Sequence, residues 1–219
     1  MLASARKGMN TRQLTTLALV ALLGISISHL LQSTRSLGQY VGENASAVQI
    51  GTSRRSPETH TGAADVTVVV FTDYQCPACR KSHRAMQSAI ARDGNIRLVY
   101  KDWPIFGDRS ERTAELALAA ERQGIYEAVH NSLMRSRSLD DATFRTIVEA
   151  AGGSWWQIQA DVARRKLSIA QQLNQNHREA LILGLQGTPG YLIGPFLIEG
   201  ALTEREFLRA FAQARAKPL

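Results

Sequence analysis

The hydrophobic residues of this chain form one long apolar stretch near the N-terminus, followed later by shorter stretches with helical or strand spacing. The long stretch covers residues 14–31 and is preceded by the basic residues Arg6, Lys7 and Arg12. Positive charge before an apolar stretch is typical of a signal that keeps the N-terminus in the cytoplasm and exports the rest of the chain. As a helix this stretch would span roughly 27 Å, close to the roughly 30 Å core of a bilayer. We therefore expect residues 1–13 to be a basic cytoplasmic N-terminus and the stretch to be a transmembrane anchor or a cleaved signal peptide.

Residues 32–62 show no sustained apolar period and are rich in Ser, Thr, Gly, Gln and Asn. Such a composition is typical of a flexible linker, so we predict a linker followed by one domain over residues 63–219. Export would place this domain in an oxidising compartment, in the periplasm or another extracytoplasmic space, where disulfides form and persist. We expect it to be anchored in the inner or cytoplasmic membrane, or to be secreted if the apolar stretch is cleaved.

The first elements of this domain alternate between strand and helix. Residues 65–71 are a run of β-branched and aromatic residues, which predicts a buried strand. A helix-compatible segment runs from Cys79 to Gly94, and residues 96–100 alternate as a second strand. Strand, helix and strand in this order form a crossover unit whose two strands pair in parallel.

A block of helical patterns comes after the second strand. Apolar residues recur at helical spacing in four segments, at residues 110–123, 126–133, 144–151 and 167–183. We therefore predict a helical insertion at about residues 107–185. Within it, we expect His130 to be partly buried, His177 to lie on a helix surface or between helices, and both Trp155 and Trp156 to pack against other helices.

The last part of the chain predicts a hairpin and a helix. Two short apolar runs, 191–193 and 196–198, are separated by a turn signal, and the pattern Thr203-x-x-Glu206 after them is a capping box. The complete order is βαβ, helices, then ββα. The predicted fold class is therefore an α/β thioredoxin-like fold with a helical domain inserted in the middle, preceded by an N-terminal hydrophobic helix.

Composition and charge narrow the range of functions. Of 219 residues, 44% are hydrophobic and 21% are charged, as in a globular protein. The net charge of +7 invites a nucleic-acid interpretation. However, residues 1–62 contain six basic and two acidic residues and so contribute +4 of this excess. Since much of the charge belongs to the export signal, we expect no nucleic-acid partner.

The two cysteines carry the candidate chemistry. Cys76 and Cys79 are separated by Pro77 and Ala78, directly after the first strand and at the start of the helix. A thiol at a helix N-terminus is close to unpaired N–H groups and to the positive end of the helix dipole, so its pKa falls. We predict that Cys76 is an exposed nucleophile and that Cys79 is a more buried resolving thiol. A metal site shared between chains and a static disulfide are the alternatives, but we expect neither a metal nor a cofactor.

The segment 71–79, Phe-Thr-Asp-Tyr-Gln-Cys-Pro-Ala-Cys, together with Gly187-Thr188-Pro189, resembles the DsbA-type thiol:disulfide oxidoreductases. The resemblance extends over about residues 65–215. It implies that Pro189 is cis, that Thr188 and Pro189 lie against the thiols, and that these two residues bind substrate together with Pro77 and Ala78. It further implies that the chain oxidises unfolded or reduced exported proteins. Reoxidation would come from a quinone-linked membrane enzyme of the DsbB or vitamin-K-epoxide-reductase type.

Two departures from the family pattern leave alternatives open. Thioredoxin-like enzymes often have a buried acid six residues before the nucleophile, where this chain has Val70, so Asp73 is a candidate for proton handling or a turn residue. The residues between the thiols include no histidine, which leaves the direction of electron flow open. The same pair could serve a reductase or an isomerase, and the domain could also be a metal carrier or a non-catalytic binding module.

One further residue and one segment could also contribute to the function. His83 comes one helical turn after Cys79, and we expect it to face solvent. Residues 103–106, Trp-Pro-Ile-Phe, could pack structurally or form part of an apolar rim for substrate.

Overall fold

The computed structural model describes residues 15–24 and 36–218. The chain divides into two units, Met1–Ser36 and Leu37–Leu219. In the first unit, residues 15–24 form a helix with exposed side chains. No helix within the described residues is long and apolar enough to cross a membrane. The predicted basic N-terminus and the remaining residues of the predicted stretch 14–31 lie outside the described residues.

The second unit is built on a mixed sheet with the strand order β1-β6-β5-β3-β4-β2. The strands are β1 (Gln39–Tyr40), β2 (Glu58–His60), β3 (Val66–Thr72), β4 (Ile96–Asp102), β5 (Gly190–Ile193) and β6 (Phe196–Glu199). The central pair β3 and β4 is parallel, which confirms the predicted crossover, and β5 and β6 form the predicted antiparallel hairpin. The outer strands β1 and β2 are antiparallel to β6 and β4.

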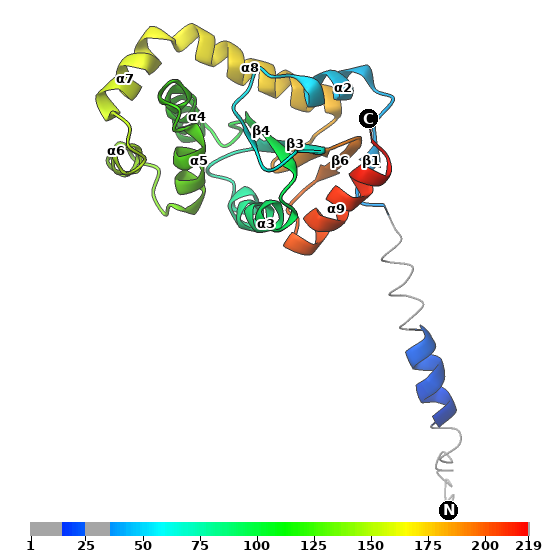
Figure 1. The fold of residues 1–219 in the computed structure, drawn as a ribbon. Coiled ribbons are helices and arrows are strands. Elements are labelled where there is room, and N and C mark those ends of the chain that lie inside the picture. The colour runs from blue at the N-terminus through cyan, green and yellow to red at the C-terminus, as the bar shows by residue number, and fades with distance from the viewer. Residues whose placement is uncertain (1–14, 25–35, 219) are drawn as a thin grey trace, which may run out of the picture. The chain divides into compact units, whose positions relative to one another are not determined.

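Helices cover both faces of the sheet (Figure 1). On one face lie α3 (Pro77–Asp93) and α9 (Glu204–Ala216), and on the other lie α2 (Ala45–Thr52) and α8 (Lys166–Leu183). The alternation of β3 divides its side chains between two cores, because successive residues of a strand point to opposite faces. Val68 and Val70 belong to the core beneath α3 and α9, whereas Val69 and Phe71 belong to the core beneath α2 and α8.

The helices between β4 and β5 occupy the place at which we expected an insertion (Figure 1). They are α4 (Asp108–Ala120), η1 (Glu121–Gln123), α5 (Tyr126–Arg135), α6 (Asp141–Ala150), α7 (Trp155–Arg164) and α8. Trp155 is buried and its ring centroid lies 5.9 Å from that of Phe144. Trp156 is 72% exposed, so the expectation that both tryptophans pack in the insertion is correct only for Trp155.

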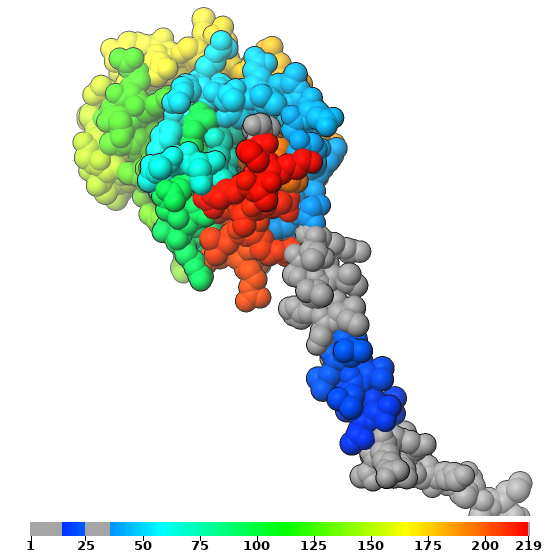
Figure 2. Space-filling view, turned by 45° about the vertical axis from the view of Figure 1, so that its right-hand side comes forward, coloured from blue at the N-terminus to red at the C-terminus, as the bar shows by residue number. Residues whose placement is uncertain are grey.

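The expectation of a flexible linker over residues 32–62 is wrong for its described part from Leu37 onward. This segment forms β1, α2 and β2, and it lies against the rest of the unit as the sky-blue to cyan surface of Figure 2. Ala47 and Ile50 of α2 are buried in one cluster with Val69 and Phe71. A helix of only two turns needs very few apolar residues to cover a sheet, so its sequence lacks a sustained hydrophobic period.

A buried arginine attaches this segment to the sheet. Arg97 of β4 is 8% exposed, and its guanidinium donates to the backbone oxygens of Gly51 at 2.7 Å and Ser53 at 2.6 Å. It also forms an ion pair with Glu58 of β2. The end of α2 and the edge strand β2 are therefore fixed to β4 by one side chain.

Replacing Ile50 by alanine tests this correction. We expect Ile50→Ala to lower the free energy of unfolding by about 2–3 kcal/mol, because it removes buried methyl groups and leaves a cavity between α2 and the sheet. The measurement is equilibrium urea unfolding. The exposed neighbour Gln49, changed to alanine, provides the matched control and should leave stability nearly unchanged. Equal stability of both variants would support a linker after all.

Candidate active site

The thiol motif starts α3. Cys76 is the N-cap residue, with φ −70° and ψ 117°, and Pro77 occupies the first turn, where the missing N–H removes no helical bond. The backbone N–H of Cys79 donates to Cys76 Sγ at 3.3 Å. The sulfur thus takes the place that a serine or aspartate oxygen has in an ordinary N-cap, and it satisfies one of the free donors of the helix.

The loop before β5 supplies the second side of the site. The Thr188–Pro189 peptide bond is cis, as the resemblance implies. When protonated, the Cys76 thiol donates to the Thr188 backbone oxygen at 3.3 Å, so two segments that are 112 residues apart in sequence meet at the sulfur. Thr188 Oγ1 is buried and makes no hydrogen bond within the described part of the chain. Its hydroxyl is free to donate to a thiolate at Cys76.

The two thiols have opposite proton affinities. The pKa of Cys76 is lowered to about 6, first by its hydrogen bond with the Cys79 thiol, and also by the Thr188 side chain and the N–H groups of Ala78 and Cys79. The pKa of Cys79 is raised far above its ordinary value, first by burial and then by the same bond to Cys76. The proton of the pair therefore stays on Cys79, and Cys76 is a thiolate at neutral pH.

One prediction about these thiols is wrong. We expected an exposed Cys76, but it is 3% exposed and Cys79 is 2% exposed, because the loop at Thr188 lies against the sulfur. Both thiols are free. Electrostatics rather than surface exposure therefore distinguishes the two cysteines. Within residues 15–24 and 36–218, no group of three or more His, Cys, Asp or Glu side chains could hold a metal ion.

Asp73 is a turn residue that ties the motif to the loop after β4. One carboxylate oxygen accepts from the N–H of Gln75 at 2.7 Å and from Ser110 Oγ at 2.6 Å. The other accepts from the N–H groups of Ile105 at 2.7 Å and Phe106 at 3.2 Å. With its carboxylate engaged in four hydrogen bonds, Asp73 fixes this loop beside the thiols, and the geometry favours a turn residue over proton handling.

The segment 103–106 is buried at its start and exposed at its end. Trp103 is buried and donates from Nε1 to His177 Nδ1 at 2.9 Å, which places His177 in a contact between α8 and this loop. Ile105 and Phe106 are 40% and 51% exposed. Gln75, the residue before Cys76, donates to the Phe106 backbone oxygen at 3.3 Å, so these exposed apolar side chains belong to the rim of the site.

The two histidines near the motif are both buried. We expected His83 to face solvent, but it is 4% exposed, because the fourth residue after Cys79 lies on the face of α3 that meets α5. Burial lowers its pKa to about 4, with a smaller contribution from the charge of Arg135. His130 of α5 lies 5.3 Å away by ring centroids and is hydrogen-bonded to Tyr74 Oη at 2.8 Å. Burial also holds the pKa of His130 well below its ordinary value, so both rings are neutral.

A family model described as the DSBA-like thioredoxin domain matches residues 67–212. This chain belongs to the DSBA-like thioredoxin domain family. The thioredoxin-like fold and the thiol–disulfide oxidoreductase activity predicted from the sequence are thereby confirmed.

Solved structures agree with this membership. A thioredoxin-like oxidoreductase from Silicibacter pomeroyi is 32% identical, with a TM-score of 0.72 over 79% of this chain and 98% of the other. The thiol-disulfide exchange protein α-DsbA2 from Wolbachia pipientis, at 23% identity, has a TM-score of 0.70 over 78% of this chain and 96% of the other. A periplasmic thioredoxin-like protein from Salmonella enterica, at 24% identity, has a TM-score of 0.67 over 80% and 98%. The latter two show the fold alone.

A curated relative is much longer than the matched part. The Na(+)/H(+) antiporter NhaA 3 of Salinispora tropica is 26% identical over 164 residues, which are 71% of this chain but 24% of that protein. The antiporter name therefore describes a larger protein, of which this chain spans about a quarter.

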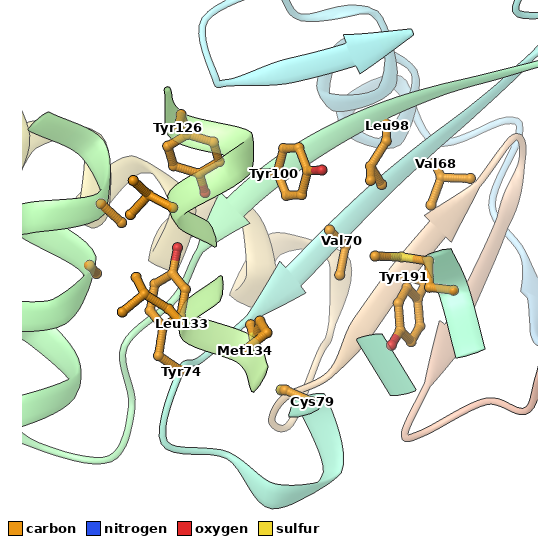
Figure 3. Close-up of a cluster of buried hydrophobic side chains, with 14 of the residues drawn as sticks. Val68, Val70, Tyr74, Cys79, Leu98, Tyr100, Tyr126, Leu133, Met134 and Tyr191 are labelled. Carbon is orange, nitrogen blue, oxygen red and sulfur yellow. The ribbon is translucent and has the colours of Figure 1, made fainter. Parts of the chain in front are cut away.

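This DSBA-like chain has a buried acid on a strand where the sequence did not suggest one. Val70 occupies the position six residues before Cys76, but Asp102 at the end of the neighbouring strand β4 is 1% exposed. Burial raises the pKa of Asp102 to about 7, and Tyr126 Oη donates to its carboxylate at 2.9 Å. Figure 3 shows Tyr74, Tyr100 and Tyr126 in the same part of the core. An acid in an otherwise buried strand was the available signal.

The lowered pKa of Cys76 predicts a pH profile for the reduced DSBA-like chain. Because the thiolate exists above the pKa, the rate of alkylation by iodoacetamide should rise with pH through a midpoint near 6 and then level off. A midpoint near ~8.5, the value of a free thiol, would contradict the proposed stabilisation. In the Cys76→Ser variant, alkylation should be negligible over the same range, because burial raises the pKa of Cys79 far above its ordinary value and its thiol stays protonated.

Proposed function

We propose that this chain introduces disulfides into exported proteins, with Cys76 as the nucleophile and Cys79 as the resolving thiol. The observation that supports this most directly is the opposite shift of the two pKa values, to about 6 at Cys76 and far upward at Cys79. A thiolate that is stabilised in the dithiol form favours reduction of the pair. The pair is then a disulfide donor, because stabilising the reduced state raises the reduction potential.

The exchange proceeds in two balanced steps. A substrate thiolate attacks the Cys76 sulfur of the Cys76–Cys79 disulfide, a bond forms between substrate and Cys76, and Cys79 leaves as a thiolate that takes up a proton. A second substrate thiolate attacks the substrate sulfur of this mixed disulfide, and Cys76 leaves as the stabilised thiolate. The substrate loses two electrons and the cysteine pair gains them.

Four residues would hold the substrate during these steps. Thr188 and Pro189 lie on one side of Cys76, and Pro77 and Ala78 come after it on α3. The Pro189 backbone oxygen accepts from the N–H of Gly200 at 2.9 Å. The Thr188 backbone oxygen, which accepts from the Cys76 thiol in the dithiol form, loses this donor when Cys76 is in a disulfide and is then available to an extended substrate. The exposed side chains of the segment 103–106 would add an apolar rim.

Each round of exchange leaves the cysteine pair reduced, so an oxidant must restore the disulfide, and the chain must reach the compartment of its substrates. We propose that a quinone-linked membrane enzyme of the DsbB or vitamin-K-epoxide-reductase type accepts the two electrons. We further propose an extracytoplasmic location, reached through the export signal of residues 1–31, with residues 14–31 as the membrane tether or a cleaved signal. The basic residues before the apolar stretch support this orientation.

The test of the function uses the oxidised protein and a reduced, unfolded protein substrate. We expect disulfides to appear in the substrate at a rate that depends on the enzyme, and we expect Cys76→Ser to reduce that rate to the background. Unchanged activity of Cys76→Ser would refute the assignment. The direction in the cell is tested separately by trapping the thiols with an alkylating agent in acid-quenched cells. A mostly oxidised pair supports the oxidase, whereas a mostly reduced pair would indicate a reductase or an isomerase.

A further inference from the structure

A cavity of about 560 Å³ begins beside the thiol motif, and its charged lining residues are all basic. Residues of α3, of the end of α5 with the loop after it, and of α4 contribute to it, and α3 and α5 lie side by side (Figure 1). We call it the basic cavity. Its six cationic residues are Arg80, Lys81, Arg84, Arg109, Arg135 and Arg137.

These cations form no ion pair with an acidic side chain in the described part of the chain. The ion pairs among the described residues involve other arginines, His60 and Lys101, and none of them includes a cation of the basic cavity. Arg112, three residues after Arg109, pairs with Asp141, which shows that acids are available nearby. Asp140 experiences the charge of Arg109, but its carboxylate is used to cap α6, where it accepts from the N–H of Thr143 at 2.7 Å.

The cations also act on one another. The pKa of Arg80 is lowered by burial and by the charge of Arg84, one helical turn away. Several like charges around one cavity repel each other and concentrate a positive potential there, since the walls are less polarisable than water. A ligand that supplies negative charge would relieve this repulsion. Guanidinium groups are well suited to carboxylates, which they bind through two parallel hydrogen bonds.

The position of the cavity connects it with the reacting sulfur. Gln75 and Pro77, the two neighbours of Cys76, both line it. A substrate held by a disulfide to Cys76 runs on at about 3.3 Å per residue, so side chains two to four positions from its cysteine lie within roughly 7–13 Å. The basic cavity is therefore within reach of residues that flank the substrate cysteine.

We propose that the basic cavity binds aspartate and glutamate side chains close to the reacting cysteine of a protein substrate. The chain is then selective for cysteines in acidic sequence surroundings. This inference rests on the proposed disulfide exchange and adds the substrate class to it. The cations accelerate the encounter and hold the acidic segment during exchange, so the selectivity decreases as salt screens the charges.

The test compares two reduced peptides that each contain one pair of cysteines. One peptide carries two glutamates two to four residues from the first cysteine, and the other carries glutamines at the same positions. The oxidised full chain is mixed with each peptide at about 20 mM and about 500 mM salt, and the rate of disulfide transfer is divided by the thiolate fraction of the peptide. We expect the acidic peptide to react about tenfold faster at low salt and nearly equally at high salt.

Two sets of variants locate the effect. The variant Arg84→Gln/Arg135→Gln/Arg137→Gln removes three exposed cations of the cavity, whereas Arg122→Gln/Arg178→Gln/Arg205→Gln removes three exposed cations elsewhere. We expect the first variant to lose the preference for the acidic peptide while its rate with the neutral peptide is unchanged. The second variant should keep the preference.

Several outcomes would overturn the proposal. These are equal rates for both peptides with the unmodified chain, a preference that persists in the cavity variant, or an equal loss of preference in both variants. Binding to vesicles of anionic phospholipid that is lost in the cavity variant, with the peptide preference intact, would assign the cavity to a membrane surface instead. Oxidation of dithiothreitol distinguishes a failure of the substrate preference from a failure of disulfide exchange itself. If neither this dithiol nor the neutral peptide is oxidised, it is the proposed function that fails.

Discussion

The Cys79→Ser variant in its reduced form should accumulate as a covalent mixed disulfide when it is incubated with a disulfide-bonded protein. The Cys76 thiolate attacks a substrate disulfide, one substrate sulfur leaves as a thiolate, and the variant has no second thiol of its own to resolve the bond. The wild-type chain should show almost no adduct, because Cys79 lies within reach of the mixed disulfide. Non-reducing electrophoresis and mass spectrometry of the adduct measure this result.

The complementary variant gives the control for this experiment. Cys76→Ser retains only Cys79, whose raised pKa keeps its thiol protonated, so it should form no adduct under the same conditions. An adduct on Cys79 in that variant would reverse the assigned roles of the two cysteines. An adduct in the wild-type chain that is as abundant as in Cys79→Ser would show that Cys79 does not resolve it.

Glu179→Ala should be among the most destabilising single substitutions in the fold, at about 3–5 kcal/mol. Lys101 of the central strand β4 is 1% exposed, and its Nζ lies 2.7 Å from the carboxylate of Glu179 on α8. Removal of the carboxylate leaves an ammonium group buried without its counter-charge. Urea unfolding of the variant and of the wild type at neutral pH measures the difference.

Two further variants separate lost charge pairing from lost contacts. Glu149→Ala removes the exposed i,i+4 pair with Arg145 and should change stability by less than about 0.5 kcal/mol. The double variant Lys101→Met/Glu179→Leu should recover most of the stability lost in Glu179→Ala, because it removes both buried charges and retains the volume. No recovery in the double variant would contradict this assignment, because the double variant contains neither an unpaired buried charge nor missing volume.

Much of the fold could be predicted from local pattern. The β-branched run of β3, the turn signals around α3, the hairpin of β5 and β6 and the capping box at Thr203 and Glu206 all depend on neighbours in sequence, and all appear in the structure. The segment around α2 was missed because its order comes from contacts with residues distant in sequence. Ile50 lies with Phe71 in the core beneath α2 and α8. Arg97 of β4 donates a hydrogen bond to the end of α2.

The candidate site was predicted in its chemistry but not in its surroundings. The sequence placed Cys76 at a helix N-terminus, and this position brings the N–H of Cys79 to the sulfur. His83 and Asp102 were not recognised as buried, because their partners His130 and Tyr126 both come from α5, which is distant in sequence. A single helical or strand period cannot show which face a distant helix will cover.

The hydrophobic and polar pattern by itself determined the order of the main elements and the position of the thiols at the start of a helix, because these depend on residues that are close in sequence. Only the tertiary structure decided that Cys76 is covered by Thr188, that part of the polar segment before β3 is folded, and that the basic cavity opens beside the motif. Each of these features joins residues from separate elements, and their distances are set by packing across the sheet.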